Sequence, residues 1–501
     1  MRFTSLVIEL IRARPRLVVW IVVLVQAALW LLVTLPFYHA PPSNLALALA
    51  YGREYQVGSE LGPPLSFWLA DIAYRAAGNH MTGVYLLAEL CDVATFWILF
   101  LLGRALVGGQ HAVLAVLLTM TVTAFGAHTL EFGPDVLARP LWALLLLHSW
   151  ELIGQRRRNV WFAWSIDAGL LLLTTSSAIM LLVLALGFAL ATKEGRRPLR
   201  SFDPLFALLV VVVLALPYLI FLLRADSPSL HWPMLADLKP RAIHWAWLIG
   251  ALVLAITGIL LLVVLNAGWF SREGEDSPII YRPPVPPLAR DFVYFFALAP
   301  AIAGSFLAAL FNLDRVVGGT GVVLSMSGLA VVIAAGDLIH LRRQRLLRAV
   351  WAAIIVAPSI AVVGSTLFLP WTSAKEIATS LPSRAIGAFF TDAFERRTNH
   401  RLAAVAGDTD IASLVALGSG RPHLFLDANP KASPWIDQAK FNETGGVVVW
   451  RASDTAGTPP AEIARRFPGL VPEVPRSFDR LVNGRQPTLR IGWAIVRPKG
   501  Q

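Results

Sequence analysis

The segment from Phe37 to Thr82 concentrates side chains whose types can perform chemistry. It lies between two strongly apolar runs and contains the turn Pro63-Pro64. Carboxylates can act as general acids or bases, and arginines bind anions through two parallel hydrogen bonds. If the chain is an enzyme, we expect its chemistry to begin here. The acidic, arginine and histidine residues of the segment are Glu54, Glu60, Asp71, Arg53, Arg75, His39 and His80.

Each of these residues also has a purely structural interpretation. Glu60 could be a solvated loop acid, and Glu54 follows Arg53, which favours an ion pair or a charge at a helix end. The cations that we expect to face outward could meet a lipid phosphate or simply anchor loops among lipid headgroups. They are Arg53, Arg75, Lys239, Arg241 and Arg315.

A second group of candidates surrounds Pro134. Asp135 is a candidate base, but it could instead cap a helix that begins at Val136, because Asp is a favoured N-cap residue. Arg139 lies one turn inside the same apolar run, where a charge is costly. Its alternatives are phosphate binding and an i,i+4 pair with Asp135. Glu131 and His128 precede them as weaker substrate-binding candidates.

Glu89 and Asp92 share one face of the second apolar run, because they are three residues apart. Two acids at that depth could form the proton relay of a transporter. We favour the alternative, in which they hydrogen-bond to neighbouring helices. The sequence has no His-x-x-x-His metal spacing, no P-loop and no recognisable Ser-His-Asp set, and its single cysteine, Cys91, lies inside the same run.

The elements that position these residues are membrane helices. The chain is 56% hydrophobic and 15% charged, with a mean hydropathy of +0.62, which is unlike a soluble domain. Apolar runs near the length needed to cross a bilayer recur along it. We predict about eleven spans, the 161–191 run being split at Thr174-Thr175-Ser176-Ser177. They are 17–36, 84–103, 112–127, 137–153, 161–174, 178–191, 204–224, 243–268, 292–312, 320–340 and 348–370.

The placement of lysine and arginine predicts the orientation of these spans. Arginine clusters such as Arg156-Arg157-Arg158 fall in alternate segments, which the positive-inside rule assigns to the cytoplasm together with the N-terminus. Residues 37–83 then form the first outer loop. The net charge of +11 is therefore mainly a topology signal, and we do not expect nucleic acid as a partner.

The chain divides into a membrane domain, residues 1–372, and a C-terminal domain, residues 373–501. The inner loop 271–291 is rich in proline and is expected to be an extended connector. In the C-terminal domain, short apolar runs alternate with helical patterns, which predicts a small extracytoplasmic α/β domain. The expected strands are 402–406, 423–426, 447–450 and 489–496, and the expected helices are 377–399, 411–417 and 461–467.

An ordered set of motifs resembles the GT-C superfamily of membrane glycosyltransferases, in particular glycosyltransferase family 39, the dolichyl-phosphate-mannose protein mannosyltransferase type. The set begins with Gly62-Pro63-Pro64-Leu65 in the first outer loop and continues with Leu102-Gly103-Arg104 at a span end. Pro134-Asp135 and Gly169-Leu170-Leu171-Leu172-Leu173-Thr174 follow. The tail resembles the outer domains of bacterial members through Val405-Ala406-Gly407-Asp408, Arg421-Pro422 and the 445–450 run.

The resemblance implies a GT-C-like bundle that moves a sugar from a polyprenyl-phosphate carrier to an envelope glycan, lipid or protein. It also implies a multi-pass protein of the bacterial inner membrane, with a carboxylate base and cations that hold the phosphate. The chain departs from the family pattern where an acid normally follows the first span, because Ser43 and Asn44 stand there. Glu54, Glu60 or Asp135 must then supply the base.

No cofactor follows from the residues, although a divalent cation could assist the reaction. Two alternatives to the transferase stay open. One is a non-catalytic GT-C-like protein that binds lipid or envelope components, and the other is a transporter that uses Glu89 and Asp92.

Overall fold

The structure, a computed structural model, describes most of the chain and forms two compact units. The described residues are 3–59, 61–126, 130–224, 238–267, 279–341, 343–373, 376–429, 431–452, 454–480, 482, 484–486 and 488–499. The bundle unit comprises Met1–Leu31, Gly62–Ser66 and Tyr85–Ile360, and the α/β unit comprises Leu32–Leu61, Phe67–Val84 and Ala361–Gln501. The residues of the predicted first outer loop therefore pack largely with the C-terminal tail.

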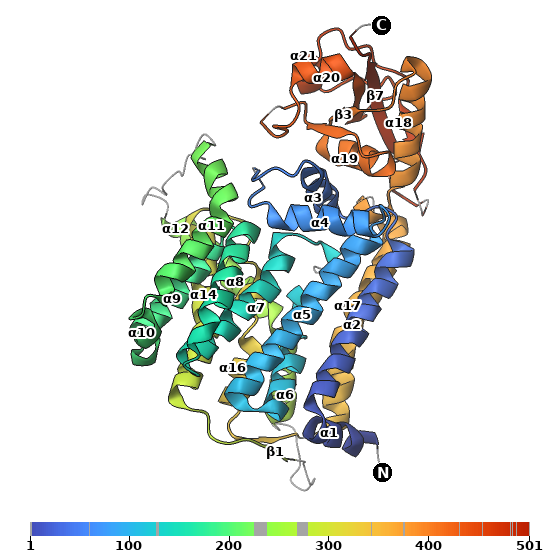
Figure 1. The fold of residues 1–501 in the computed structure, drawn as a ribbon. Helices are drawn as coiled ribbons and strands as arrows, with labels where there is room; N and C mark the ends of the chain where they lie inside the picture. The colour runs from blue at the N-terminus through green and yellow to red at the C-terminus, as the bar shows by residue number, and fades with distance from the viewer. Residues whose placement is uncertain are drawn as a thin grey trace. The chain divides into compact units, whose positions relative to one another are not determined.

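The bundle unit is built from helices, several of which run side by side in Figure 1. They are dominated by apolar residues on all faces, as expected for helices that contact lipid. Their bounds, including α2 and α17, which continue into the α/β unit, are α1 Phe3–Ala13, α2 Pro15–Phe37, α5 Thr82–Val107, α6 Gly109–Thr119, α7 Pro134–Ile153, α8 Trp161–Thr174, α9 Ala178–Ala191, α10 Lys193–Leu199, α11 Asp203–Arg224, α12 Leu238–Ala255, α13 Thr257–Ala267, α14 Pro287–Leu310, α15 Thr320–Val323, α16 Ser327–Ala334 and α17 Gln344–Thr372.

The chain is a multi-pass membrane protein, but it has fewer full-length spans than predicted. Among the described residues, six helices are long and apolar enough to cross a bilayer, or eight if each of two bent helix pairs is one span. The bent pairs are α9 with α10, at 109°, and α12 with α13, at 56°. The predicted spans 112–127, 161–174 and 320–340 correspond to the shorter helices α6, α8 and α15–α16. The predicted break after Thr174 is confirmed by the end of α8.

A two-stranded sheet replaces the end of one predicted span. Strand β1 (Ile279–Tyr281) pairs antiparallel with β2 (Leu338–His340), with Ile280 opposite Ile339. The following Arg282 is buried, donates to the Gly336 carbonyl oxygen and forms an ion pair with Asp337. The apolar run 320–340 therefore does not continue as one helix, because its last residues pair as strand β2.

The α/β unit contains a five-stranded sheet in the order β4-β3-β5-β7-β6. Strands β4, β3 and β5 are parallel, whereas β7 pairs antiparallel with β5 and β6. The four predicted strands and three predicted helices are all present, and the short β6 and α20 were not predicted. The bounds are α3 Ser43–Arg53, α4 Leu65–Ala76, α18 Ser383–Thr398, β3 Ala404–Gly407, α19 Thr409–Gly418, β4 His423–Leu426, α20 Gln438–Thr444, β5 Gly446–Arg451, α21 Ala461–Arg466, β6 Arg476–Phe478 and β7 Leu489–Val496.

The core of the sheet domain lies between its sheet and helices. It is dominated by large apolar side chains, with Phe425, Phe441 and Trp450 buried together. After β3, Gly407 adopts φ +115°, and a Cβ there would lie 1.9 Å from the Val449 carbonyl oxygen, so only glycine fits. Asp408 then caps α19 by accepting hydrogen bonds from the backbone N–H groups of Asp410 and Ile411.

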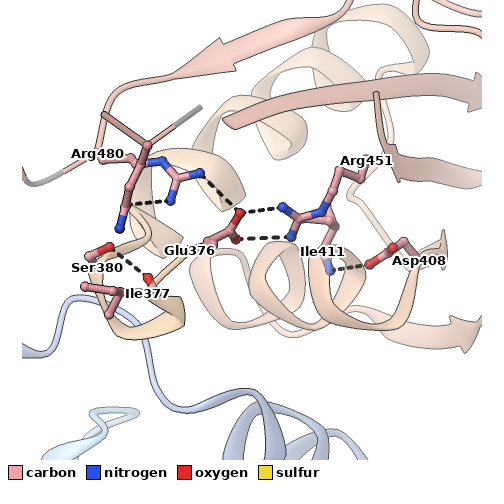
Figure 2. A network of polar contacts seen from close by, with 8 residues as sticks. Glu376, Ile377, Ser380, Asp408, Ile411, Arg451 and Arg480 are labelled. Atoms are coloured by element: carbon pink, nitrogen blue, oxygen red, sulfur yellow. Dashed lines mark hydrogen bonds and ion pairs between the residues drawn. The ribbon is translucent and has the colours of Figure 1, made fainter. Parts of the chain in front are cut away.

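Glu376, in the segment that follows α17, connects the end of β5 with the segment that follows β6. Figure 2 shows its carboxylate between Arg451 and Arg480, accepting hydrogen bonds from both guanidinium groups. Burial alone would raise the pKa of Glu376 and is the largest single effect. The combined hydrogen bonds and charges of Arg451 and Arg480 outweigh it and lower that pKa.

The Glu376 contacts predict a pH-dependent stability of the α/β unit. Because the pKa of Glu376 is lower in the folded state than its ordinary value of 4.5, its contribution is full above that value and is lost as the pH falls through the folded-state pKa. We expect Glu376→Gln to lower the free energy of unfolding by about 1 kcal/mol at pH 7, with the difference from wild type shrinking below pH ~4.

Thermal unfolding of the detergent-solubilised chain, followed by tryptophan fluorescence, measures this difference. Glu462→Gln is the matched control, because Glu462 is exposed on α21. A wild-type-minus-variant difference that stays constant down to pH 3 would contradict the expectation.

Candidate functional site

Two short helices order the first loop. Helices α3 and α4 approach so closely at Gly52 that a Cβ there would lie 2.1 Å from the Phe67 carbonyl oxygen. Tyr51 on α3 donates a hydrogen bond to the carbonyl oxygen of Ala432, in the C-terminal tail. Trp68 on α4 donates to the backbone of Gln56 at 3.0 Å. The loop is thus held by contacts along its length within the α/β unit.

Asp71 on α4 is the most heavily bonded acid of the loop. Its carboxylate is fully buried and lies 2.7 Å from Arg75 Nε. It also accepts hydrogen bonds from Arg421 and from the Tyr55 hydroxyl. Arg421 in turn donates to the Leu49 carbonyl oxygen at 2.6 Å. With three donors on a buried carboxylate, Asp71 is a structural residue, and Arg75 is its partner rather than a free phosphate ligand.

Glu54 lies at a helix end, as its structural interpretation anticipated, and it contacts a histidine of the C-terminal tail. It lies at the C-terminal end of α3, and its Oε1 is 2.8 Å from Nδ1 of His423 on β4. The Glu54 side chain is only 9% exposed. The cavity that Glu54 shares with Arg53 and Arg421 has a volume of about 10 Å³, which holds roughly one water molecule. A sugar does not fit there.

Arg53 adds a half-buried cation to the same cluster. The pKa of its guanidinium is lowered, mainly by burial and further by the charges of Arg421 and Arg75. The charges of Glu54 and Asp71 raise that pKa but do not outweigh the other effects. Its Nη1 is buried and has no hydrogen-bond partner among the described residues. Of the predicted site residues, the structure thus brings Arg53, Glu54 and Arg75 together with Asp71.

The sequence analysis missed the partners of these acids. Arg421 and His423 come from the C-terminal tail, where Arg421-Pro422 had been noted only as part of a resemblance. Arg421 adopts the left-handed backbone region, with φ 56°. In the sequence, the available signal was the position of this arginine directly before the predicted strand 423–426.

The second group of candidates lies at the N-terminal end of α7, in the bundle unit. Asp135 is the second residue of α7 and Gly133 is the N-cap, so the expectation that Asp135 caps a helix starting at Val136 was wrong. Asp135 and Glu131 are exposed, and neither forms an ion pair within the described part of the chain. The backbone at Gly319 lies beside Asp135, since a Cβ there would be 3.1 Å from the carboxyl carbon.

Arg139 pairs with a different acid from the one expected. Its Nη1 lies 2.8 Å from Asp92 Oδ1 on α5, and its Nη2 donates to the Ala124 carbonyl oxygen at 2.9 Å. The guanidinium also stacks 5.0 Å from the Phe125 ring centroid. These contacts replace the predicted pair with Asp135, and they bury Arg139, so we no longer expect it to bind phosphate. For Asp92, they confirm the interpretation as a helix–helix contact.

The remaining candidates are more dispersed. Lys239 and Arg315 are exposed and Arg241 is half-buried. His244, one turn after Arg241 on α12, lies 3.0 Å from the Leu313 carbonyl oxygen, two residues before Arg315. Glu60 and His128 lie outside the described residues. Within the residues that are described, no three histidine, cysteine or acidic side chains are grouped to hold a metal ion.

Arg139→Met is expected to destabilise the bundle by about 3 to 5 kcal/mol, because it leaves the buried Asp92 carboxylate unpaired. The double variant Asp92→Leu with Arg139→Met should recover most of that loss, since no buried charge remains. Thermal unfolding in detergent measures both. Unchanged stability of Arg139→Met together with weakened binding of a polyprenyl phosphate would instead support a phosphate-binding role.

Two kinds of comparison relate this geometry to known proteins. Residues 62–221 match the family described as dolichyl-phosphate-mannose-protein mannosyltransferase. No curated protein sequence matches the chain.

Two crystal structures of ArnT from Cupriavidus metallidurans are similar to the whole chain. The structure bound to undecaprenyl phosphate has a TM-score of 0.60 at 13% identity, and covers 97% of this chain and 99% of ArnT. The apo structure has a TM-score of 0.58 at 13% identity, with coverage of 96% and 97%. At this identity the likeness establishes the fold, including a C-terminal sheet domain after the bundle.

Proposed function

We propose that this chain is a membrane glycosyltransferase of the GT-C type, which transfers a sugar from a polyprenyl-phosphate carrier to an envelope acceptor. The observation that carries the proposal is the mannosyltransferase family match over residues 62–221. In addition, 97% of this chain is covered by the fold of a protein that was crystallised with undecaprenyl phosphate. The acceptor is a glycan, lipid or protein. The positive-inside pattern supports an inner-membrane protein whose N-terminus is cytoplasmic and whose tail is outside.

The proposed reaction is a substitution at the anomeric carbon of the sugar. An acceptor hydroxyl oxygen forms the new glycosidic bond while the bond between the anomeric carbon and the phosphate oxygen breaks. The lipid phosphate leaves with the bonding electrons, and a carboxylate takes the proton of the hydroxyl. The protein must therefore supply an available carboxylate and cations for the developing negative charge.

Asp135 is the described acid that best fits the role of base. It is exposed and free of ion pairs within the described residues, whereas Asp71 is saturated and Glu54 is engaged by His423. Glu54 is also no positional substitute for the missing acid at Asn44. The two lie at opposite ends of α3, about 15 Å apart at 1.5 Å per residue. Glu60 stays a candidate outside the described residues.

We propose that the phosphate binds cations of the bundle unit that form no ion pair within the described residues. Lys239, Arg241 and Arg315 form no ion pair within the part of the chain that the structure describes. Arginine is suited to such a phosphate because its planar guanidinium donates two parallel hydrogen bonds. A divalent cation stays an optional addition, and it would need ligands from the substrate phosphate as well as the protein.

A non-catalytic, lipid-binding protein is the second candidate. The observation that favours it is the absence of a carboxylate at Ser43 and Asn44, together with the ion pairs that occupy Asp71 and Glu54. This alternative keeps the lipid carrier as partner and removes the transfer step.

The transfer step predicts a specific lipid phenotype. In a strain lacking the chain, we expect its sugar-loaded polyprenyl phosphate to accumulate, because the consuming reaction is gone. Mass spectrometry of lipid extracts measures the accumulation and identifies the sugar by its mass. Asp135→Asn should fail to reverse it, since losing a general base slows transfer by about 10²- to 10⁴-fold.

Asp291→Asn is the matched control, because Asp291 is an equally exposed acid on α14 and is not a candidate for the site. It should restore the wild-type lipid profile, with immunoblots confirming equal protein levels. If Asp135→Asn restores the lipid profile but Glu54→Gln or Glu60→Gln does not, the base is an acid of the first loop. Rescue by all three variants would support the non-catalytic alternative.

A further inference from the structure

An apolar cavity of about 300 Å³ lies within the bundle unit, away from the acids described above. It is lined by α7, α8, α9, α10 and α11, through side chains such as Leu152, Trp164, Ala185 and Leu208. Leu208 is 58% exposed and Leu186, also in the lining, is 51% exposed. Because these positions of a membrane bundle face hydrocarbon, a lipid chain can reach the cavity from the bilayer.

The cavity lies at the opposite end of α7 from Asp135. Leu152 and Ile153 line it at the C-terminal end of the helix, whereas Asp135 is at the N-terminal end. A separation of 17 residues corresponds to about 26 Å along the helix axis. The cavity is therefore distinct from the proposed transfer site, and it faces the cytoplasmic leaflet in the proposed orientation.

A sharp turn of the chain forms one wall of the cavity. Helix α10 is bent by 109° from α9, and Thr192 caps it by accepting a hydrogen bond from the Gly195 N–H at 3.2 Å. Gly195 is buried at the turn, where a Cβ would lie 2.5 Å from the Ala189 carbonyl oxygen. Gly195, Pro198 and Leu199 of α10 line the cavity, which places the polar residues of this helix beside it.

The polar side of α10 carries unneutralised positive charge. Lys193, Arg196, Arg197 and Arg200 are exposed, and none has a carboxylate partner among the described residues. Within the described residues, the Arg196 side chain donates to the Thr192 carbonyl oxygen. Nearby cations differ in this respect, because Arg157 pairs with Glu151 and Arg158 with Asp203. Glu194 is the acid of α10, and it is half-buried.

We propose that this cavity binds an anionic glycerophospholipid of the cytoplasmic leaflet. One acyl chain occupies the apolar space, and the phosphate lies against the arginines of α10. Two observations select this occupant over a neutral lipid or a soluble ligand: the lining opens among lipid-exposed side chains, and four cations without acidic partners adjoin it. Basic pockets between membrane helices on this side are suited to anionic headgroups.

Native mass spectrometry of the purified full-length chain, titrated with phosphatidylglycerol and phosphatidylcholine, tests the proposal. We expect phosphatidylglycerol to bind at least tenfold more tightly. The double variant Arg196→Gln with Arg197→Gln should lose about tenfold in phosphatidylglycerol affinity, since each arginine near an anionic surface contributes a several-fold factor. Arg345→Gln, an exposed basic residue on α17, is the matched control and should bind normally.

A second variant tests the cavity itself. Ala185→Phe fills the space and should weaken phosphatidylglycerol binding, whereas Val183→Phe, on the exposed face of α9, should leave it unchanged. Thermal unfolding checks that both variants are folded. Equal binding of both phospholipids, or an equal loss in Arg345→Gln, would overturn the proposal. So would a loss confined to undecaprenyl phosphate.

The outcome is separable from the proposed transfer reaction. Asp135→Asn should bind phosphatidylglycerol like the wild type, because Asp135 lies at the other end of α7. Failure of the lipid test would leave the transferase proposal intact, and the reverse also holds.

Discussion

One buried carboxylate, Asp71, organises the α/β unit. A fully buried charge is tolerated only when it is paired and hydrogen-bonded, and Asp71 obtains its partners from both ends of the chain. Arg75 and Tyr55 belong to the first loop, whereas Arg421 is 350 residues away in sequence. The helices α3 and α4 and the C-terminal sheet domain therefore form one compact body rather than a loop and a separate tail. The Glu54–His423 pair adds a second connection between the same segments.

The bundle unit also contains buried charges, and they too are paired. Arg139 and Asp92 neutralise each other between α7 and α5, and the Ala124 carbonyl oxygen accepts a further hydrogen bond. Asp135, Lys239 and Arg241, which form no ion pair within the described residues, lie instead in the first turns of α7 and α12. This separation of paired from unpaired charges is what distinguishes Asp135 from Asp71 and Glu54 as a candidate for chemistry.

Much of the fold followed from apolar patterning, because that signal is local. The strands of the C-terminal domain and the polar break after Thr174 were predicted at their observed positions. Fewer full-length spans are found among the described residues than predicted, since the runs at 112–127, 161–174 and 320–340 form only short helices and residues 338–340 pair as strand β2. Local composition also could not reveal which buried groups would meet.

The candidate site was less predictable because it depends on contacts between distant segments. Arg139 was expected to pair with Asp135, its neighbour on the same helix, yet Asp92 on another helix is its partner. Nothing near Glu54 in sequence pointed to His423. The sequence did identify the candidate acids. The structure then showed which of them have side-chain partners, as Asp71 and Glu54 do, and that Asp135 forms no ion pair within the described residues.

The origin of the Asp71 partners constrains how this protein is made. Ribosomes add roughly 5 to 20 residues per second, so about 20 to 70 seconds separate the synthesis of Asp71 from that of Arg421, 350 residues later. During that interval the first loop lacks Arg421, one of the two arginines that pair with its buried acid. The loop therefore reaches its final structure only after Arg421 has been synthesised, so the assembly of this unit depends on a late segment of the chain.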